Sequence, residues 1–406
     1  MVQFFYFHLM PWPHLPPDFD RRQTSAWVTF SNRHYDPERG HVLYNEYLDE
    51  MERAEILGYD GLGVNEHHQN AYGTMPSPNL MAAALIRRTS RAKIAILGNA
   101  LPLHDHPLRV AEEVAMLDVL SGGRVISGFV RGIGCEYLSS GVNPTYSRER
   151  FYEAHDLILR AWTEEGPFSF EGKHYRVRYA NVWPRPLQRP HPPIWLPSQG
   201  STETIRWAAQ RRYPFISVFT SFAQTKRLLE EYKAAAEAAG YTAQAEQIGF
   251  ALPTYVAETD ARAREEAKPH MLWLFHRGLK IPPHWLLPPG YITEESLRKF
   301  LGAGLRPPSE LSFEELEKGG YVLVGSAATV ADRLKEIHRQ LGFGLFIGGG
   351  RTGDMPHDKA EKNMELFARE VMPQLRDQDG APGARGVSPH PPTHGVPAPR
   401  GKRGRR

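Results

Sequence analysis

The sequence predicts an α/β fold in which eight parallel strands and their helices close into a (β/α)8, or TIM, barrel. Short apolar runs with strand character recur along the chain, and most are followed by a stretch with helical spacing of apolar residues. Strand–helix units repeated in this way build a parallel sheet that helices cover. A doubly wound open sheet is the competing arrangement, but eight strands in a chain of 406 residues favour the barrel.

The predicted elements follow one another with clear boundaries. Gly58 stops the first long helix, Pro107 suits the first turn of another, and Gly122 ends that helix, because glycine and proline favour these positions. The strands are expected at residues 4–9, 60–65, 93–97, 124–130, 193–197, 215–219, 248–257 and 345–348. The helices are expected at residues 44–57, 78–88, 107–120, 150–162, 202–211, 224–239, 329–341 and 359–375.

Two segments do not fit the alternation of strands and helices. Residues 277–320 lie between the seventh and eighth strands, are rich in proline and carry Trp285, so we expect an excursion that acts as a lid. A short extra strand is expected at residues 321–324. The tail is rich in Pro, Gly, Arg and His and has few apolar residues to bury. The predicted organisation is one barrel domain over residues 1–376 and a disordered basic tail over residues 377–406.

Composition indicates an ordinary globular protein. Hydrophobic residues make up 41% of the chain and charged residues 23%, and much of the net charge of +3 comes from the tail. The body is therefore close to neutral, and no basic face indicates nucleic acid. Cys135 is the only cysteine, which fits a reducing cytoplasm. The N-terminus lacks signal-peptide features and no long apolar run occurs, so we expect a cytoplasmic protein without a membrane span.

Titratable residues follow the second strand at once, at positions 65–68. Active sites of such barrels lie at the carboxyl ends of the strands, where buried polar groups need a partner. Side chains alternate along a strand, so Asn65 and His67 are expected to face the barrel mouth, with Glu66 and His68 in support. His67 is therefore the main catalytic candidate. A purely structural hydrogen-bonded cluster is the alternative, and a metal site is not favoured because adjacent histidines on a strand point apart.

An arginine among glycines follows the fourth strand, in the run 128–134 (GFVRGIG). Glycines let a ligand approach the backbone, and a guanidinium binds anions well. Arg131 is therefore a candidate anion contact, with an ordinary turn and a surface arginine as the alternative. Arg150, near the start of the next helix, could add a second charge or could be a solvated helix end.

Small hydroxyl residues join the fifth strand to its helix. Gly200, Ser201 and Thr202 lie at this junction, and a helix N-terminus binds phosphate through its N–H groups and its dipole. Ser201 or Thr202 could equally serve only as the N-cap. Combined with Arg131 and Arg150, the junction predicts a phosphate pocket for a cofactor.

These motifs, in this order, resemble those of the bacterial luciferase-like flavin-dependent monooxygenases. The resemblance covers about residues 1–376, and its specificity lies in the order and spacing of the motifs. The matching segments are 65–68 (NEHH), 101–113 (LPLHDHPLRVAEE), 117–124 (LDVLSGGR), 128–132 (GFVRG), 200–209 (GSTETIRWAA), 324–326 (VGS) and 364–373 (MELF to VMP).

The resemblance implies a TIM barrel that binds reduced FMN at its mouth. It implies a monooxygenase acting on paired donors with O2, in which a C4a-(hydro)peroxyflavin oxygenates a small, fairly hydrophobic organic substrate. His67 matches the family's active-site histidine. Gly98 and Asn99 fall where the family often has a non-proline cis peptide under the flavin ring. The matches on the phosphate side are Arg131, Arg150, Ser201 and Thr204.

The resemblance also implies a partner protein, a homodimeric assembly and two alternative functions. No G-x-G-x-x-G follows a strand, so reduced flavin is expected from a separate flavin reductase. The dimer is expected to pack through helices near the second and third strands. A deazaflavin F420-dependent hydride-transfer enzyme and a non-catalytic flavin-binding protein are the alternatives. Val130 and Gly200 stand where the light-emitting luciferases carry a cysteine and an acidic residue, which points to the broad monooxygenase class rather than to light emission.

Overall fold

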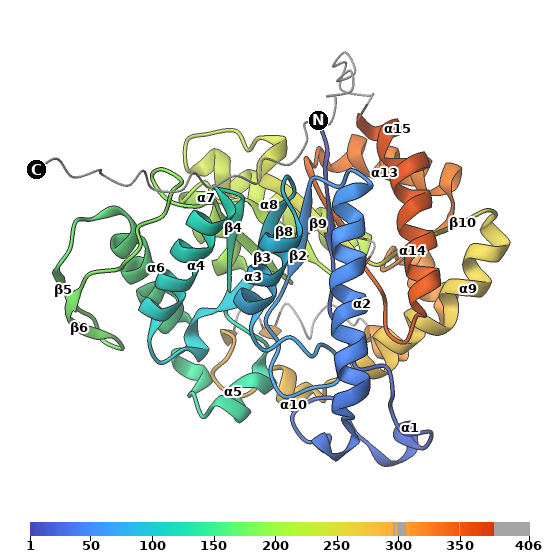
Figure 1. Ribbon diagram of the computed structural model, residues 1–406, viewed down its shortest axis with the longest axis horizontal. Coiled ribbons are helices and arrows are strands. Elements are labelled where there is room, and N and C mark those ends of the chain that lie inside the picture. Colours follow the sequence, from blue (N-terminus) through green and yellow to red (C-terminus); the bar gives the residue numbers. More distant parts are fainter. Residues whose placement is uncertain (295–296, 299–305, 349, 377–406) are drawn as a thin grey trace, which may run out of the picture.

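The computed structural model describes residues 1–294, 297–298, 306–348 and 350–376. Eight strands that all pair in parallel close into a barrel, in the order β1-β12-β9-β8-β7-β4-β3-β2. The prediction of a (β/α)8 barrel is therefore confirmed (Figure 1). The barrel strands are β1 Gln3–Phe7, β2 Gly61–Val64, β3 Lys93–Ala100, β4 Val125–Val130, β7 Ile194–Ser198, β8 Phe215–Val218, β9 Ile248–Leu252 and β12 Leu345–Gly348.

Helices surround the barrel (Figure 1). The tail predicted at residues 377–406 lies outside the described residues. The final helix is interrupted by a π turn at Phe367–Val371, between α14 and α15. The longer helices are α2 Pro37–Ile56, α3 Pro78–Arg88, α4 Pro107–Ser121, α6 Ser147–Thr163, α7 Thr202–Gln210, α8 Phe222–Ala238, α9 Asp260–Trp273, α13 Ala327–Leu341 and α14 His357–Leu366. The shorter ones are α1 Phe19–Arg22, α5 Gly134–Ser140, α10 Pro283–Leu286, α12 Phe313–Lys318 and α15 Met372–Arg376.

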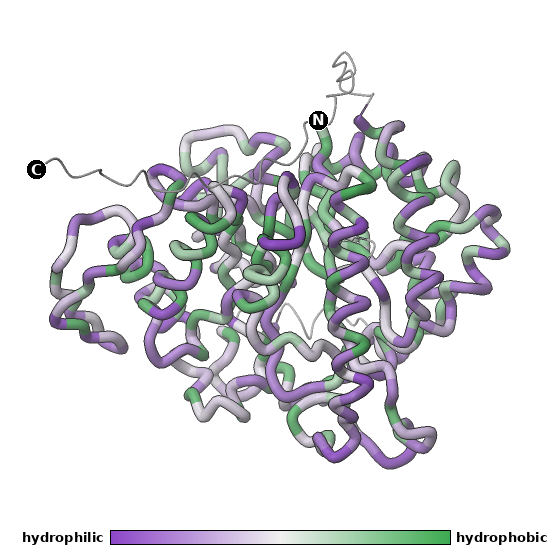
Figure 2. The backbone as a smooth tube through the Cα atoms, viewed as in Figure 1, coloured by the Kyte–Doolittle hydropathy of each residue, from purple (hydrophilic) through white to green (hydrophobic). Residues whose placement is uncertain are grey.

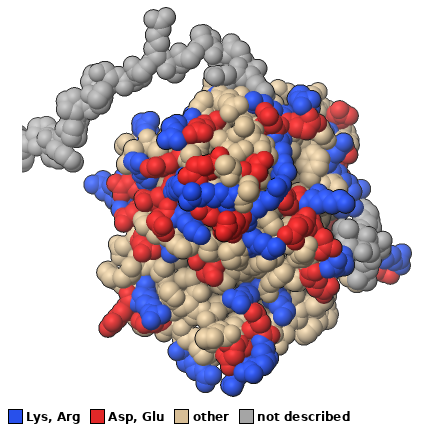
Figure 3. Space-filling view, turned by 90° about the vertical axis from the view of Figure 1, so that its right-hand side faces the viewer, with Lys and Arg blue, Asp and Glu red and all other residues tan. Residues whose placement is uncertain are grey.

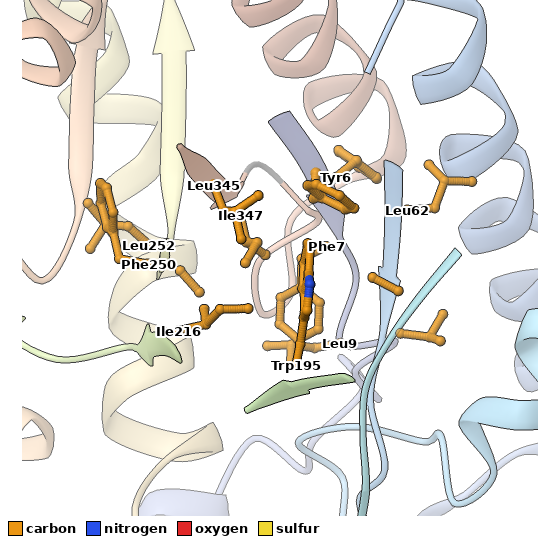
Figure 4. Packing of buried hydrophobic residues seen from close by; sticks show 14 of the residues in the cluster. Tyr6, Phe7, Leu9, Leu62, Trp195, Ile216, Phe250, Leu252, Leu345 and Ile347 are labelled. Atoms are coloured by element: carbon orange, nitrogen blue, oxygen red, sulfur yellow. The ribbon is translucent and has the colours of Figure 1, made fainter. Parts of the chain in front are cut away.

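Aromatic and branched side chains fill the barrel. Phe5 and Trp195 meet edge to face inside it, with ring centroids 4.9 Å apart. A Cβ atom on Gly61 would lie 2.2 Å from the Phe5 ring, so glycine leaves the room that these large rings need. Figure 4 shows Phe7, Trp195 and Ile347 gathered between the strands. Each buried large side chain contributes roughly 2 kcal/mol through loss of apolar surface from water.

The surface follows the usual division of hydropathy. Hydrophobic residues concentrate in the central strands and hydrophilic ones on the outer helices (Figure 2). The face that carries α9 and α14 shows cationic and anionic side chains intermixed (Figure 3). Among the described residues, no helix combines the length and the apolarity that crossing a bilayer requires.

The predicted seventh strand, residues 248–257, is wrong in extent. Only Ile248–Leu252 lies in the barrel, because Pro253 has no N–H with which to continue the ladder. The next four residues, Thr254–Ala257, form β10 and pair in parallel with β11, Leu323–Ser326. The extra strand expected at residues 321–324 is therefore β11, shifted by two residues.

Other elements lie in connections for which the sequence predicts no structure. Strands β5 (Phe168–Glu171) and β6 (Arg176–Ala180) form an antiparallel hairpin between α6 and β7. Helix α9 precedes the excursion expected at residues 277–320, and an internal proline, Pro269, together with many charged residues obscures its helical pattern. The excursion contains α10 and α12, and parts of it lie outside the described residues.

Candidate active site

The carboxyl ends of the barrel strands open at the lower side of Figure 1, where α5 and α10 are labelled. Strands β2, β3, β4 and β7 are consecutive neighbours in the barrel. Each of the predicted site segments follows or ends one of these four strands. Their shared edge of the barrel mouth is therefore the candidate site.

Glu66 is a buried carboxylate held by two histidines. Its Oε1 accepts from His68 Nε2 at 2.8 Å and lies 3.2 Å from His104 Nε2, while Oε2 accepts from the Ala100 N–H at 3.2 Å. Burial alone would raise the pKa of Glu66, but the hydrogen bonds from His104 and His68 outweigh it and lower the pKa to about 2. The hydrogen bond to Glu66 raises the pKa of His68. Glu66 therefore holds His68 at the end of β2, and its hydrogen bond from the Ala100 N–H links that end to the end of β3.

His67 lies between a carboxylate and two aromatic rings. Its Nδ1 is 3.3 Å from Glu136 Oε1, and its ring centroid is 5.2 Å from that of Trp27 and 5.3 Å from that of Tyr72. The side chain remains 16% exposed. When Nδ1–H donates to Glu136, the lone pair of Nε2 is left to accept a proton. The geometry therefore suits a general base or acid at the mouth.

Glu136 fixes this arrangement from α5. The carboxylate is buried and accepts from the N–H groups of Ile133 at 2.8 Å and His68 at 3.0 Å, besides facing His67. Sequence reasoning missed Glu136, although a glutamate at the third position of a helix is a capping signal. His104 was missed too, despite its place inside the 101–113 motif.

Asn65 directly follows β2, and the prediction that it faces the mouth rests on strand alternation. Gly61 and Gly63, four and two residues earlier, adjoin the interior rings of Phe5 and Phe7. Asn65 is buried, and its Oδ1 has no hydrogen-bond partner among the described residues. A buried acceptor of this kind is normally satisfied by water or a ligand.

Arg131 lies under the excursion. Its Nη1 donates to Ser147 Oγ at 3.1 Å and to the carbonyl of Tyr291 at 2.9 Å, and the Tyr291 ring covers the guanidinium at 4.4 Å. Ser147 opens α6, so Arg131 and the start of α6 adjoin as expected. The contact with Tyr291 could not be predicted, because 160 residues separate the two.

Arg150 supports a neighbouring loop. Its Nε donates to the Pro102 carbonyl at 3.0 Å and its Nη2 to the His104 carbonyl at 3.3 Å, and its guanidinium lies 4.9 Å from the Tyr175 ring centroid. The guanidinium therefore holds the segment after β3 that carries His104.

The β7–α7 junction has the geometry of an anion site. Ser201 is the N-cap of α7, because its Oγ accepts from the Thr204 N–H at 3.2 Å and lies 2.7 Å from Thr204 Oγ1. Gly200 has a φ of +96°, and a Cβ atom there would lie 2.3 Å from the Leu228 side chain. Any side chain at position 200 is therefore excluded, which explains the absence of an acidic residue there.

Gly98 and Asn99 have different roles. The non-proline cis peptide lies between Leu97 and Gly98, one bond before Gly98–Asn99. A Cβ atom on Gly98 would lie 2.4 Å from the backbone of Gly128, so only glycine allows β3 and β4 to approach so closely. The Asn99 amide exchanges hydrogen bonds with Asn79 at 3.0 and 3.1 Å. The structure does not bring the Asn99 side chain together with Arg131.

An apolar cavity of about 20 Å³ lies at the ends of β1, β8, β9 and β12. This volume holds about one water molecule. Its lining includes Phe7, Leu9, Phe219, Leu252 and Ile347, together with Arg351 and Thr352. The mouth is thus mostly apolar on this side and polar at the ends of β2, β3, β4 and β7.

These residues fit a cofactor that carries a phosphate and a flat polar ring. Arg131 and the Ser201-capped start of α7 provide the cationic end. The unpartnered Oδ1 of Asn65 can accept from a ring N–H, and the close approach at Gly98 leaves no side chain in the way.

Comparison with known proteins shows the family to which the chain belongs. A family model described as luciferase-like monooxygenase matches residues 25–343. The oxygenase component of the flavin-dependent trigonelline monooxygenase of Acinetobacter baylyi is 24% identical over 340 residues, which are 82% of this chain and 91% of that protein. The 4-hydroxyprotoasukamycin monooxygenase of Streptomyces nodosus subsp. asukaensis is 28% identical over 363 residues, covering 83% and 89%. An uncharacterized protein of Sinorhizobium fredii, y4wF, is 36% identical over 176 residues, but only 51% of its length is covered.

Solved structures agree in fold. The monooxygenase RslO1 of Streptomyces bottropensis is 25% identical, with a TM-score of 0.70 over 92% of this chain and 100% of that chain. The FMN complex of the 3,6-diketocamphane monooxygenase of Pseudomonas putida is 20% identical, with a TM-score of 0.69 over 92% and 98%. The family model spans well over half of the chain, and so this protein belongs to the luciferase-like monooxygenase family.

Proposed function

We propose that this protein uses reduced FMN and O2 to insert one oxygen atom into a small, fairly apolar organic molecule. The carrying observation is the His67–Glu136 pair, 3.3 Å apart, at the same strand edge as the cationic corner around Arg131. The proposal is supported by the family and by relatives that are named as flavin-dependent or diketocamphane monooxygenases.

The phosphate of FMN is assigned to the cationic corner. Arg131 would offer a guanidinium, Ser201, which caps α7 through the Thr204 N–H, would offer a hydroxyl, and Arg150 holds the loop after β3. Asn65 would offer an acceptor to the flavin, and the side-chain-free backbone at Gly98 and the neighbouring Asn99 would leave room for its ring. When bound, reduced FMN supplies the activation of O2.

The protein supplies proton control and exclusion of water. His67 holds or accepts a proton at Nε2 while Glu136 fixes the ring through Nδ1. Trp27 and Tyr72 stack 5.2 Å apart beside His67, and the Trp27 indole donates to the Gly278 carbonyl at the base of the excursion. Glu66 and His68 position the ends of β2 and β3 around it.

The substrate is assigned to the apolar side of the mouth. Most of the cavity lining is apolar, and the charge of the lining residue Arg351 is paired with Glu46 and Glu50, which suits an uncharged, fairly hydrophobic molecule. Opening of the surrounding loops has to enlarge the cavity before a substrate can enter.

Reduced FMN is proposed to come from a separate reductase, as the words "oxygenase component" in the name of one relative suggest. The chain is proposed to form a homodimer through α3 and α4. Large apolar side chains are exposed on these helices, with Leu80 at 68% and Leu120 at 54%.

Cofactor titration tests the proposal. Purified protein is titrated anaerobically with reduced FMN and, separately, with reduced F420, and the complex is then mixed with O2. We expect saturable binding of reduced FMN, weaker binding of F420, and oxygen consumption that depends on the protein-bound flavin. Binding of F420 alone with hydride transfer, or no binding of reduced FMN, would contradict the proposal.

A further inference from the structure

Arg148, in the first turn of α6, carries a buried cationic nitrogen without an acceptor. Its Nη1 has no hydrogen-bond partner among the described residues, although the whole side chain is only 20% exposed. Its Nη2 lies 3.4 Å from Glu203 Oε2, which is a long contact. A guanidinium donor buried in this way is costly unless an anion meets it.

Arg148 lies in the same corner as Arg131. The residue before it, Ser147, accepts from Arg131 Nη1 at 3.1 Å. Its partner Glu203 stands in the first turn of α7, the helix that Ser201 caps. Burial raises the pKa of Tyr291, and the charges of Arg131 and Arg148 both oppose that rise. The two guanidinium groups therefore lie near Tyr291, one from the end of β4 and the other from the start of α6.

The excursion shields this corner from water. The Tyr291 carbonyl accepts from Arg131, and Thr293 Oγ1 donates to Glu203 Oε1 at 2.8 Å. A Cβ atom on Gly134 would lie 2.3 Å from the Leu286 carbonyl, so α10 packs directly on α5. Cations in a shielded corner bind an anion more strongly than cations in open solvent.

Arg148 and Arg150 differ in what their nitrogens contact. Arg150 donates from its Nε and Nη2 to two backbone carbonyls. Arg148, which faces the start of α7 from α6, has a buried Nη1 without an acceptor among the described residues. We propose that Arg148 is a further cofactor-binding residue that recognises the phosphate group, with Nη1 as the donor. This inference rests on the proposed function, because it assigns the phosphate of the same cofactor.

Comparing two flavins that differ only in the phosphate isolates this role. Dissociation constants for FMN and riboflavin are measured by fluorescence titration for wild type, Arg148→Gln and Arg206→Gln. Arg206 is an exposed arginine on α7 and serves as the charge-matched control. We expect Arg148→Gln to weaken FMN binding about tenfold or more while riboflavin changes less than about threefold. Arg206→Gln should leave both values near those of wild type.

Two results would overturn the assignment. Arg148→Gln could bind FMN as tightly as wild type, or it could weaken FMN and riboflavin equally, which would indicate a structural role. If Arg148→Gln does not fold, Arg148→Lys decides. Lysine lacks the planar fork of the guanidinium. The preference for FMN, measured as the dissociation constant of riboflavin divided by that of FMN, should therefore fall at least about threefold. An unchanged ratio overturns the inference.

The same titration separates this inference from the function on which it rests. Wild type that binds neither flavin would contradict the flavin-dependent function itself. Wild type that binds FMN, together with an Arg148→Gln variant that retains the wild-type preference for FMN over riboflavin, would leave that function standing and remove only Arg148.

Discussion

Two buried carboxylates, Glu66 and Glu136, organise the side chains at the mouth. Glu66 binds His68 and faces His104, whereas Glu136 faces His67 and accepts from the His68 backbone. The two carboxylates therefore contact different imidazole rings, although both bind His68, one at its ring and the other at its backbone N–H. Glu66 joins strand ends, and Glu136 sets the direction of the one histidine assigned to proton transfer.

Replacing His67 separates chemistry from binding. We expect His67→Ala to lower the rate of product formation about a hundredfold, the usual scale for a general acid or base, with the affinity for reduced FMN nearly unchanged. His41→Ala, at an exposed position on α2, is the control and should keep the wild-type rate. Turnover of His67→Ala at the wild-type rate would remove His67 from the mechanism.

Glu136→Gln tests the positioning of His67. The amide keeps the size of the side chain but cannot stabilise a protonated imidazole, so we expect the pH–rate profile to shift to lower pH along the limb that reports His67. The profile is measured as kcat against pH for wild type and variant. A uniform loss of rate with an unshifted profile would assign Glu136 a purely structural role.

Glu66→Gln should reduce stability in a pH-dependent way. The pKa of Glu66 in the folded protein is lowered to about 2, so its contribution is present above the ordinary glutamate pKa of 4.5 and is lost as pH falls towards 2. The pKa of His68 is raised, so its contribution is full below the ordinary histidine pKa of 6.5 and is lost as pH rises through the raised pKa.

The wild-type advantage should therefore be largest between about pH 4.5 and 6.5. There we expect Glu66→Gln to lower the free energy of unfolding by about 2 kcal/mol, because its partly buried histidine partners lose a charged hydrogen-bond acceptor. Urea denaturation across a pH series measures this difference. A difference that is independent of pH from 3 to 9 would contradict the ion-pair account.

Strand alternation could be applied from sequence alone within β2, where Gly61 and Gly63 adjoin interior rings. That Asn65, just beyond the strand, faces the mouth stays a prediction. The partners of His67 could not be predicted, because Glu136 is 69 residues away and Trp27 lies on another loop. The family motif marks positions such as Asn99 and Arg150 but does not reveal their hydrogen-bond partners. In the structure both side chains bond to other groups of the protein.

At the scale of elements, the close contact of β3 and β4 is the critical packing feature of the site. Gly98 approaches the Gly128 backbone where a Cβ atom would lie 2.4 Å away. Strand positions and most helices were predictable because their apolar period and glycine or proline boundaries are local. The β5–β6 hairpin and the path of the chain out of the barrel into β10 depend on strand pairing, which the local sequence does not reveal. Only the end of β9 is marked locally, by Pro253.

Gly98→Ala should therefore destabilise the protein strongly. We expect a loss of about 3 kcal/mol or more, because backbone atoms of β4 would have to move. Gly141→Ala is the control, since a Cβ atom there meets nothing within 4 Å and only its φ of +71° is unfavourable, at a cost of about 1 kcal/mol. Urea midpoints measure both, and equal losses for the two variants would contradict the packing account.

At the scale of the whole molecule, the barrel presents a polar and an apolar side at one mouth. The polar side carries the histidines and the cationic corner, and the apolar side carries the cavity lined by Phe7 and Ile347. The excursion bridges the two, because Trp27 donates to Gly278 and Tyr291 accepts from Arg131. The sequence predicts an excursion from residue 277, whereas the chain already leaves the barrel after Leu252, and the residues that the excursion covers could not be predicted.

The proposed homodimer gives a prediction on the same scale. We expect sedimentation velocity to show a dimer for wild type, and Met116→Glu combined with Leu120→Glu on the exposed face of α4 to give a monomer. The hairpin residue Tyr179, exposed at 68%, provides the control variant Tyr179→Glu, which should stay dimeric. A wild-type monomer at micromolar concentration would contradict the prediction.

The central claim is the transfer of one atom of O2 to an organic substrate, and isotope labelling measures it directly. The protein is supplied with reduced FMN and ¹⁸O2 and incubated with a panel of small, uncharged, apolar ketones, aldehydes and aromatic compounds. The account predicts a product that contains one ¹⁸O atom, formed by wild type and strongly reduced with His67→Ala. Product formation without O2, or a product that carries only oxygen from water, would contradict it.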